Sequence, residues 1–324
     1  MILFSSDWHL NDKQPIHNTI ILNYMNYLQD YMKENDIKNF VFGGDLIHNS
    51  NKINYHTFVP VFKKFLEWKD IGIKSIFIIG NHDQLAKDNS LLELLEPLGK
   101  VIIKPETISI DGIDYDFCPY TENVEDLPNN SEVLFSHLDV KDFYFNKVKQ
   151  SDNEYFTQES FHNYSLLISG HFHRQQTGGK VVYVGSPNQL NFNEEGEKKY
   201  FCVINDNEYN LVEIPNTVDY ITIDLNNFKS YDRDIFRNKF VKVNISSKIE
   251  NFVKLKNILY EYGAVDVVPN FIKEENIKDE EGHNIDLQKG VLSSMTKYLS
   301  EIKIKEIDNK KLLNVFKELL KEII

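Results

Sequence analysis

Residues 75–83 of this 324-residue chain read Ser-Ile-Phe-Ile-Ile-Gly-Asn-His-Asp. The apolar run Ser75–Gly80 predicts a buried strand, and an amide, an imidazole and a carboxylate follow it at Asn81, His82 and Asp83. In α/β folds the loops at the carboxyl ends of strands converge on one crevice, where ligands and catalytic groups gather. The stretch therefore indicates an α/β fold with a polar site at one edge of a sheet.

Four more segments repeat this arrangement, each at the end of a predicted strand. They are Asp7-Trp8-His9 after Ile2–Ser6, Asp45-Leu46-Ile47-His48 after Phe40–Gly44, Ser136-His137 at the end of Val133–Ser136, and Gly170-His171-Phe172-His173 at the end of Leu166–Gly170. Any one of these segments alone is more typical of an ordinary polar loop. All five in this order favour a functional site over a structural role for the six histidines they contain.

The spacing inside the motifs supports a metal site. In an extended segment residues i and i+2 point the same way, so Asp7 and His9 should face one site together, as should His171 and His173. The glycines before Asp45, Asn81 and His171 permit tight turns and a close approach to a ligand. Carboxylate, amide and imidazole without thiolate suit Mn²⁺, Fe²⁺ or Zn²⁺ better than a structural cysteine–zinc centre.

The elements between the motifs predict the architecture. Amphipathic stretches at Ile16–Lys33 and His56–Lys69 alternate with the first strands, which indicates βαβ units. Later, Asp111-Gly112 between apolar flanks predicts a hairpin, Asn205–Asn207 resembles a second one, and Val181–Gly185 is a further strand. We therefore expect a mixed α/β fold in which two stacked sheets form a sandwich flanked by helices.

After Pro215 the pattern changes. Strands are predicted at Tyr220–Leu225, Lys239–Ile245 and Ala264–Val268 and a helix at Phe252–Tyr262, which is enough for a small α+β domain. A charged, apolar-poor linker and two amphipathic helices, Asp286–Ile302 and Asp308–Ile324, follow. The expected domains are residues 1–215, a small capping domain at 216–272, a linker at 273–285 and C-terminal helices at 286–324.

Composition restricts the setting of the protein. The net charge of −13 and the presence of only three arginines argue against a simple nucleic-acid binder, so metal ions, local lysines or a partner would have to attract DNA. Cys118 and Cys202 lie far apart in apolar segments, which favours two buried thiols in a reducing cytoplasm over a disulfide. No run approaches the roughly 18 apolar residues of a membrane span.

For the remaining histidines and the tryptophan inside the first motif, the sequence predicts no functional role. We expect surface positions for the four histidines outside the motifs, which are His17, His56, His162 and His283. Trp8 lies between two candidate ligands, and we expect it to pack in the core and not to stack on a substrate.

Together the motifs resemble the signature of the calcineurin-like metallophosphoesterase superfamily, D-x-H, G-D, G-N-H-[DE], a lone H and G-H-x-H. Within it the chain is similar to the SbcD family, nuclease subunits of DNA double-strand-break repair and recombination complexes that include phage versions. His48 stands three residues after Asp45, as in that family, and Gly185-Ser186-Pro187-Asn188-Gln189-Leu190-Asn191-Phe192 resembles the segment after its last ligand motif.

The resemblance implies roles for ten residues. One divalent cation would be held by Asp7, His9, Asp45 and His173, and a second by Asp45, Asn81, His137 and His171, with Asp45 bridging. His48 and His82 would contact the scissile phosphate, and Asp83 would orient His82. Manganese is the implied metal, with magnesium, iron and zinc as alternatives, and metal-activated water would hydrolyse the phosphodiester bond.

The resemblance also implies partners. DNA would be the substrate, an SbcC-like ATPase with coiled-coil arms would bind the C-terminal helices, and a homodimer is open. The location would be the cytoplasm, or the host cytoplasm for a phage-encoded chain. In the last helix Leu312, Phe316, Leu319 and Ile323 recur at helical spacing, a pattern that fits either docking on a partner or packing on the chain itself.

Two other functions are weighed against the nuclease. A phosphodiesterase of cyclic or small nucleotides would share the same core, but it would leave the region after residue 215 without a purpose. A metal-free scaffold of the same fold is disfavoured, because every ligand position holds a competent side chain.

Overall fold

Two six-stranded sheets carry the fold in the computed structural model, which describes residues 1–49, 52–86, 89–215, 217–246 and 252–272. The first sheet has the order β14-β13-β1-β2-β3-β6, with bounds Glu208–Glu213, Tyr200–Asn205, Ile2–Ser5, Asn39–Phe42, Lys74–Ile78 and Gly99–Ile102. The second has the order β11-β12-β10-β9-β8-β7, with bounds Gln176–Gly178, Val181–Tyr183, Leu166–Ser169, Val133–Ser136, Ile113–Cys118 and Glu106–Ile110.

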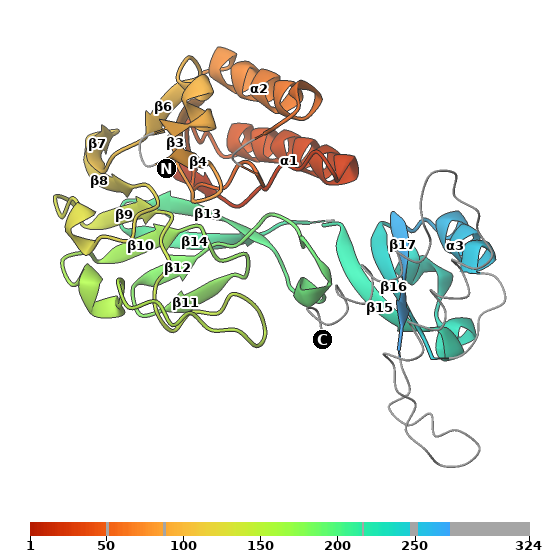
Figure 1. The fold of residues 1–324 in the computed structure, drawn as a ribbon. Helices are drawn as coiled ribbons and strands as arrows, with labels where there is room; N and C mark the ends of the chain where they lie inside the picture. The colour runs from red at the N-terminus through yellow and green to blue at the C-terminus, as the bar shows by residue number, and fades with distance from the viewer. Residues whose placement is uncertain (50–51, 87–88, 216, 247–251, 273–324) are drawn as a thin grey trace, which may run out of the picture. The chain divides into compact units, whose positions relative to one another are not determined.

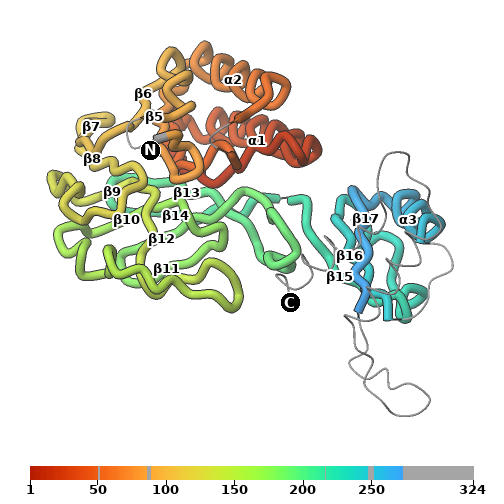
Figure 2. The backbone as a smooth tube through the Cα atoms, in the orientation of Figure 1, coloured from red at the N-terminus to blue at the C-terminus, as the bar shows by residue number. Residues whose placement is uncertain are grey.

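Both sheets are mixed, as the sequence predicts. Strands β1, β2, β3 and β6 run parallel, while β13 joins β1 antiparallel and β14 joins β13 antiparallel. In the second sheet β8, β9, β10 and β12 are parallel and lie side by side in Figure 2, with β7 and β11 antiparallel at the edges. Hence β1–β3 and β9–β10, the strands that the five motifs follow, all belong to parallel blocks.

The two sheets pack face to face around an apolar layer. Phe4 and Val41 of the first sheet and Phe135 and Ile168 of the second are buried in one hydrophobic cluster, and the Phe4 and Phe135 rings stack 5.8 Å apart. Full burial of such side chains contributes roughly 1.5–3 kcal/mol each. The predicted α/β sandwich is confirmed.

Two amphipathic helices cover the other face of the first sheet (Figure 1). Helix α1, Pro15–Glu34, begins with a proline, whose missing N–H costs nothing in the first turn, and buries Ile21, Met25, Leu28 and Met32 on one face. Helix α2, Tyr55–Asp70, buries Phe65 and Trp68. Both helices agree with the predicted stretches to within a residue at each end.

Trp8 packs in this same helix-covered layer. Its ring is fully buried, stacks on Phe65 at 5.7 Å and meets Phe42 edge-on at 5.0 Å. The expectation of a packing role is therefore confirmed.

His17 corrects the sequence prediction of four surface histidines. It is buried in α1, where its Nε2–H donates to the Trp8 carbonyl at 2.9 Å and its Nδ1 accepts from the Asn188 amide at 3.2 Å. The pattern did not indicate these partners, because one of them lies 171 residues away. His56 and His162 are exposed as expected, and His283 lies outside the described residues.

The turns and the cysteines agree with the predictions from the sequence. Asp111 and Gly112 both have positive φ, 53° and 88°, and join β7 to β8 as a tight hairpin. Asp206, with φ 56°, turns between β13 and β14. Cys118 and Cys202 are buried free thiols.

A separate three-stranded sheet follows residue 215. Its order is β15-β16-β17, Asp219–Asp224, Lys239–Ile245 and Asp266–Phe271, with helix α3 at Phe252–Glu261. Val241, Val243 and Ile245 are buried in alternation along β16, as predicted. The described residues within Met1–Asn244 and Ile249–Asn270 group as one compact unit. The domain boundary at residue 215 stays a prediction, and the linker and C-terminal helices lie outside the described residues.

No helix in the described ranges is long and apolar enough to cross a membrane.

Candidate metal centre

The loops after β1 and β2 are joined by their backbones. The Asp7 N–H donates to the Gly44 carbonyl at 2.9 Å and the His9 N–H to the Asp45 carbonyl at 3.0 Å. A bridge between Leu10 and Ile47 continues the pairing. These bonds hold the first motif against the second, so their side chains converge although 38 residues separate Asp7 from Asp45 in the chain.

The backbone of these loops is not extended, which corrects the local reasoning from spacing. Asp7, His9, Asp45 and His171 have φ values of 58°, 46°, 58° and 92°, in the left-handed region that costs non-glycine residues of order 1–3 kcal/mol each. Asp7 and His9 do reach one site, but through tight left-handed turns. Such strain persists only where surrounding bonds fix it, and it concentrates at functional sites.

Two glycines permit the close packing. A Cβ atom on Gly80 would lie 2.2 Å from Asp45 Oδ1. Gly44 has φ +95°, and its Cβ would lie 2.4 Å from His137 Nδ1. Glycine is therefore needed before Asp45 and Asn81 because a side chain would collide with the site, and not only because of turn geometry.

The Asp45 carboxylate lies between two groups of imidazoles. Its Oδ2 is 3.5 Å from His9 Nε2, and its Oδ1 is 3.4 Å from His137 Nε2. Oδ1 also accepts from the His82 N–H at 2.9 Å. The side chain is buried, with 2% exposed. One carboxylate therefore presents one oxygen to each group.

The first group contains Asp7, His9 and His173. One ligand atom from each lies within 4.8 Å of the others, and His9 Nε2 is 2.9 Å from His173 Nε2. His9 Nδ1 is buried and has no hydrogen-bond partner in the described part of the chain.

The second group contains Asn81, His137 and His171. The Asn81 Oδ1 lies 3.1 Å from His137 Nε2 and 2.9 Å from His171 Nδ1. His137 Nδ1–H donates to the Gly43 carbonyl at 2.8 Å, which fixes the tautomer and aims Nε2 at the site. The structure thus brings together all seven residues predicted to hold metals.

His48 and His82 lie beside these groups. The His82 Nδ1–H donates to the His48 carbonyl at 2.9 Å, and the two rings stack at 5.8 Å between centroids. With His9 they place three ring nitrogens within 4.8 Å of one another. His48 is exposed and His82 half-buried, so both are open to a ligand from solvent.

Asp83 has partners different from those expected. Its fully buried carboxylate accepts from the N–H groups of Asp45, Ile47 and Gly80 at 2.8, 3.1 and 3.0 Å. The predicted orientation of His82 by Asp83 is therefore wrong: the His48 carbonyl orients that ring, and Asp83 braces the loop that carries Asp45.

The charges of Asp45, His137 and His9 influence one another across the centre. Burial alone would raise the pKa of the Asp45 carboxyl, but His137, His9 and His82 hold it well below its ordinary value. Burial lowers the pKa of His137, yet Asp45 more than offsets this and raises it to about 9. Burial and then His173 lower the pKa of His9. Without a cation, a proton on His137 neutralises the charge of the Asp45 carboxylate. His9 is a neutral imidazole, the form that can bind a metal cation.

The sequence reasoning did not predict three charged neighbours of the centre. Asp139 Oδ2 lies 3.9 Å from His171 Nε2, Glu194 Oε1 lies 3.4 Å from His173 Nδ1, and Lys199 Nζ lies 2.6 Å from Glu194 Oε2. None of them stands in a strand-end motif. Only Asp139, two residues after His137, had a positional signal.

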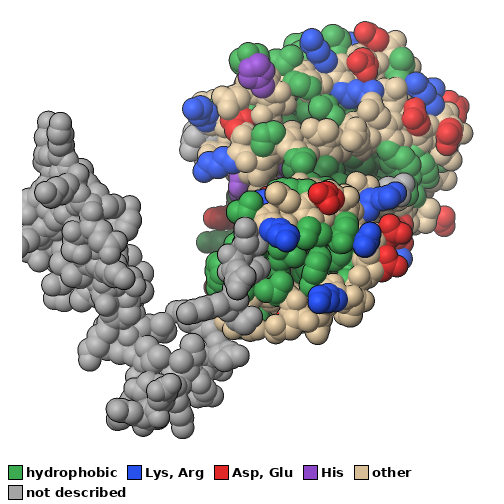
Figure 3. All heavy atoms as spheres, turned by 90° about the vertical axis from the view of Figure 1, so that its right-hand side faces the viewer, with side chains coloured by type: hydrophobic (Ala, Val, Ile, Leu, Met, Phe, Trp, Pro, Cys, Tyr) green, Lys and Arg blue, Asp and Glu red, His purple; other side chains and the backbone are tan. Residues whose placement is uncertain are grey.

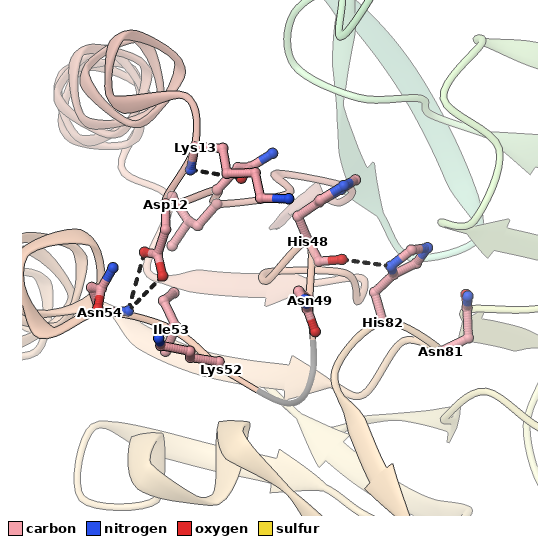
Figure 4. A pocket seen from close by; sticks show the side chains of 11 residues that line it. Asp12, Lys13, His48, Asn49, Lys52, Ile53, Asn54, Asn81 and His82 are labelled. Carbon is pink, nitrogen blue, oxygen red and sulfur yellow. Dashed lines mark hydrogen bonds between the residues drawn. The ribbon is translucent and has the colours of Figure 1, made fainter. Parts of the chain in front are cut away.

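A cavity of about 520 Å³ adjoins the centre. Figure 4 shows His48, His82 and Asn81 on one side of it and Lys13, Lys52 and Asn54 around the rest. The Asp12 carboxylate accepts from the Asn54 N–H through both oxygens, at 3.1 and 3.0 Å. Lys13 and Lys52 both line this cavity, and no ion pair joins either of them to another side chain that the structure describes.

An α/β sandwich with carboxylate, amide and imidazole donors at the ends of its parallel strands fits a hydrolase of phosphoester bonds. Residues 1–221 match the sequence profile of the calcineurin-like phosphoesterases, and the chain belongs to that family. The resemblance and the enzyme class predicted from the motifs are confirmed.

Two relatives align with most of this chain. Exonuclease subunit 1 of Enterobacteria phage T4 is 25% identical over 300 residues, which cover 86% of this chain and 88% of that protein. Phosphoesterase 244L of Invertebrate iridescent virus 6 is 24% identical over 285 residues, 79% of this chain and 96% of that protein. Among solved structures, an archaeal phosphodiesterase aligns over 66% of this chain and 99% of its own, with 12% identity and a TM-score of 0.37.

Proposed function

We propose that this protein is a DNA nuclease that hydrolyses phosphodiester bonds with two divalent cations, manganese in the native enzyme. The observation that carries the proposal is the Asp45 carboxylate, which presents Oδ2 to His9 and Oδ1 to His137. A carboxylate shared in this way is the usual means of holding two cations ~3.5–4 Å apart.

The donors fit cations of this kind. The Nε2 atoms of His9 and His173 lie 2.9 Å apart, close enough to bind one cation together. The buried His9 Nδ1 has no hydrogen-bond partner among the described residues. The set contains no thiolate, which favours Mn²⁺, Fe²⁺ or a catalytic Zn²⁺ over a structural cysteine–zinc centre. Asp7, His9, Asp45 and His173 would hold one cation, and Asp45, Asn81, His137 and His171 the other.

When bound, the cations would supply Lewis-acid activation of water and neutralise charge on the phosphate. The chain's own contribution is orientation and proton transfer. The His82 Nδ1–H is committed to the His48 carbonyl, so Nε2 is the ring atom left to face the substrate. In the doubly protonated ring, the Nε2–H would donate to a phosphate oxygen or pass its proton to a departing 3′ oxygen. His48 is exposed at the same edge and can stabilise the same charge.

Local lysines support a nucleic-acid substrate despite the net charge of −13. On the coloured part of the face in Figure 3, cationic and acidic side chains are interspersed and form no continuous cationic stripe. Lys13 and Lys52, in contrast, line the cavity beside His48 and His82 (Figure 4). The two ammonium groups outnumber the one carboxylate among the described lining residues, Asp12, and would attract the phosphates next to the scissile one.

The proposed assembly follows from similarity to a protein named as an exonuclease subunit. We propose that an SbcC-like ATPase with coiled-coil arms is the partner, bound through the helices predicted at residues 286–324, and that the nuclease also pairs with a second copy of itself. DNA repair and recombination would be its setting.

Incubation of the purified chain with labelled linear duplex DNA tests the proposal. Cleavage should require Mn²⁺, cease with a chelator and rise when the ATPase and ATP are added; Mg²⁺, Fe²⁺ and Zn²⁺ are compared in parallel. A chain that binds two cations but turns over only cyclic or small nucleotides would instead be a small-molecule phosphodiesterase. A chain that binds no cation would refute the proposed centre.

A further inference from the structure

Two charged side chains behind the centre are almost completely buried. Glu194, the last residue of the 3₁₀ turn Phe192–Glu194, has 5% of its surface exposed, and Lys199, just before β13, has 1%. Burying a charge costs several kcal/mol unless good geometry compensates for it. Such a pair therefore needs an explanation from its contacts.

The contacts of Lys199 lead to a candidate ligand. Its Nζ donates to the His173 carbonyl at 2.9 Å, to Ser186 Oγ at 3.1 Å and to Glu194 Oε2 at 2.6 Å. A second carboxylate, Glu197 Oε2, lies 3.6 Å away. The ammonium is thus satisfied from several sides and fixes both Glu194 and the backbone of His173.

Glu194 connects this ammonium to the imidazole. Its Oε2 accepts from Lys199, and its Oε1 lies 3.4 Å from His173 Nδ1. The opposite ring nitrogen, Nε2, lies 2.9 Å from His9 Nε2. A carboxylate behind a metal-binding imidazole fixes its tautomer, holds the ring and makes the other nitrogen a better donor.

We infer that Glu194, held in place by Lys199, is the positioning residue for His173 and sets the cation affinity of the position that His9 and His173 face. The inference rests on the proposed metal centre and adds a residue to it that acts only through His173. Asn81, His137 and His171 do not contact Glu194, so the second cation position should not depend on it.

The chain supplies matched controls next to each residue. Glu195 points away from His173, since its carboxylate accepts from the Thr222 N–H at 2.8 Å and from Thr222 Oγ1 at 2.6 Å. Lys198 is exposed and pairs with Glu213 at 2.8 Å. Glu195→Ala and Lys198→Met therefore remove the same groups from the same segment without touching His173.

Titration of the metal-free full-length chain with Mn²⁺, followed by calorimetry, measures the effect without relying on activity. Wild type should bind two ions. In Glu194→Ala the affinity of one ion should fall about 10–100-fold while that of the other stays unchanged. Lys199→Met should weaken the same ion, and the two control variants should match wild type.

A conservative variant separates positioning from structural support. Glu194→Gln keeps an oxygen that can accept from His173 Nδ1, so it should recover part of the affinity that Glu194→Ala loses; it also decides the matter if the alanine variant fails to fold, as checked by circular dichroism. Unchanged affinity in Glu194→Ala would overturn the inference. The inference would also be wrong if Glu194→Ala and Glu195→Ala both weakened the binding of the two ions to the same extent. Failure of wild type to bind any Mn²⁺ would instead overturn the proposed centre, and the inference with it.

Discussion

Asp45 shows how much chemistry one side chain concentrates at this site. Its two oxygens face different imidazole groups, and its backbone N–H is held by the buried Asp83 carboxylate. Its own backbone is left-handed, a conformation that the bonds to the neighbouring loop maintain. A residue so constrained should tolerate no replacement, because both the charge and the exact placement of each oxygen matter.

Asp45→Ala should abolish both cation binding and turnover, because each proposed cation loses the ligand it shares with the other. Elemental analysis of the purified variant and a DNA cleavage assay with added Mn²⁺ measure the two effects. Asp30→Ala, an exposed aspartate of α1, serves as the control and should behave as wild type. Cleavage by Asp45→Ala at the wild-type rate would show that the site is misassigned.

His48→Ala and His82→Ala should keep both cations but lose about 10²–10⁴-fold in kcat, since general acid–base help of this kind is typically worth that much. The exposed His56 supplies the control, His56→Ala. One nitrogen of each ring lies within 4.8 Å of a His9 nitrogen, so either ring could reach the same cation. The metal content of the variants therefore distinguishes a metal ligand from a general acid–base residue. Loss of an ion in His82→Ala would make that residue a ligand.

At the scale of elements, the centre is built by loops and supported by strands. The carboxyl ends of β1, β2 and β3 in one sheet and of β9 and β10 in the other supply all of its predicted residues. The strands were predictable because uninterrupted apolar runs mark buried parallel strands, and each of the five runs that precede a motif agrees with an observed strand to within two residues. The loop backbones were not, because their left-handed turns depend on bonds between different loops.

The loops that carry Lys13 and Lys52 should govern attraction of DNA. The double variant Lys13→Gln/Lys52→Gln should raise KM for DNA while leaving kcat nearly unchanged, because neither ammonium contacts the metal-binding residues. The slope of log affinity against log salt concentration should become shallower by about 1–2, as expected for two lost phosphate contacts. Lys33→Gln/Lys63→Gln, at exposed helix positions, is the matched control. An unchanged salt dependence would remove these lysines from the substrate path.

At the scale of the whole molecule, chemistry and assembly should be separable. The candidate centre is built from residues 7–173, whereas docking of the ATPase is proposed for residues 286–324, outside the described part of the chain. A chain with a net charge of −13 is poorly equipped to follow long DNA unaided, so a partner would supply that function.

Removal of residues from Asp286 onward should therefore leave the chain folded, loaded with two cations and active with Mn²⁺ on short DNA. Complex formation with the ATPase and ATP-dependent cleavage of long duplexes should be lost. Co-purification with the ATPase measures the first effect, and full-length chain processed in parallel is the reference. Undiminished binding by the shortened chain would refute the docking role, and unfolding would show that the helices pack on their own protein.

The sequence by itself determined the α/β sandwich and which ten residues gather at the site. Apolar runs and the short polar motifs that end them are local signals, and parallel strands necessarily bring their carboxyl ends to one edge. Tertiary structure alone decided the partners of those residues: that Asp83 braces the Asp45 loop, that His17 is buried against Asn188, and that Glu194 and Lys199 lie behind His173. Those pairings join segments from different parts of the chain, so each partner is set by how the elements pack and not by any pattern around either residue.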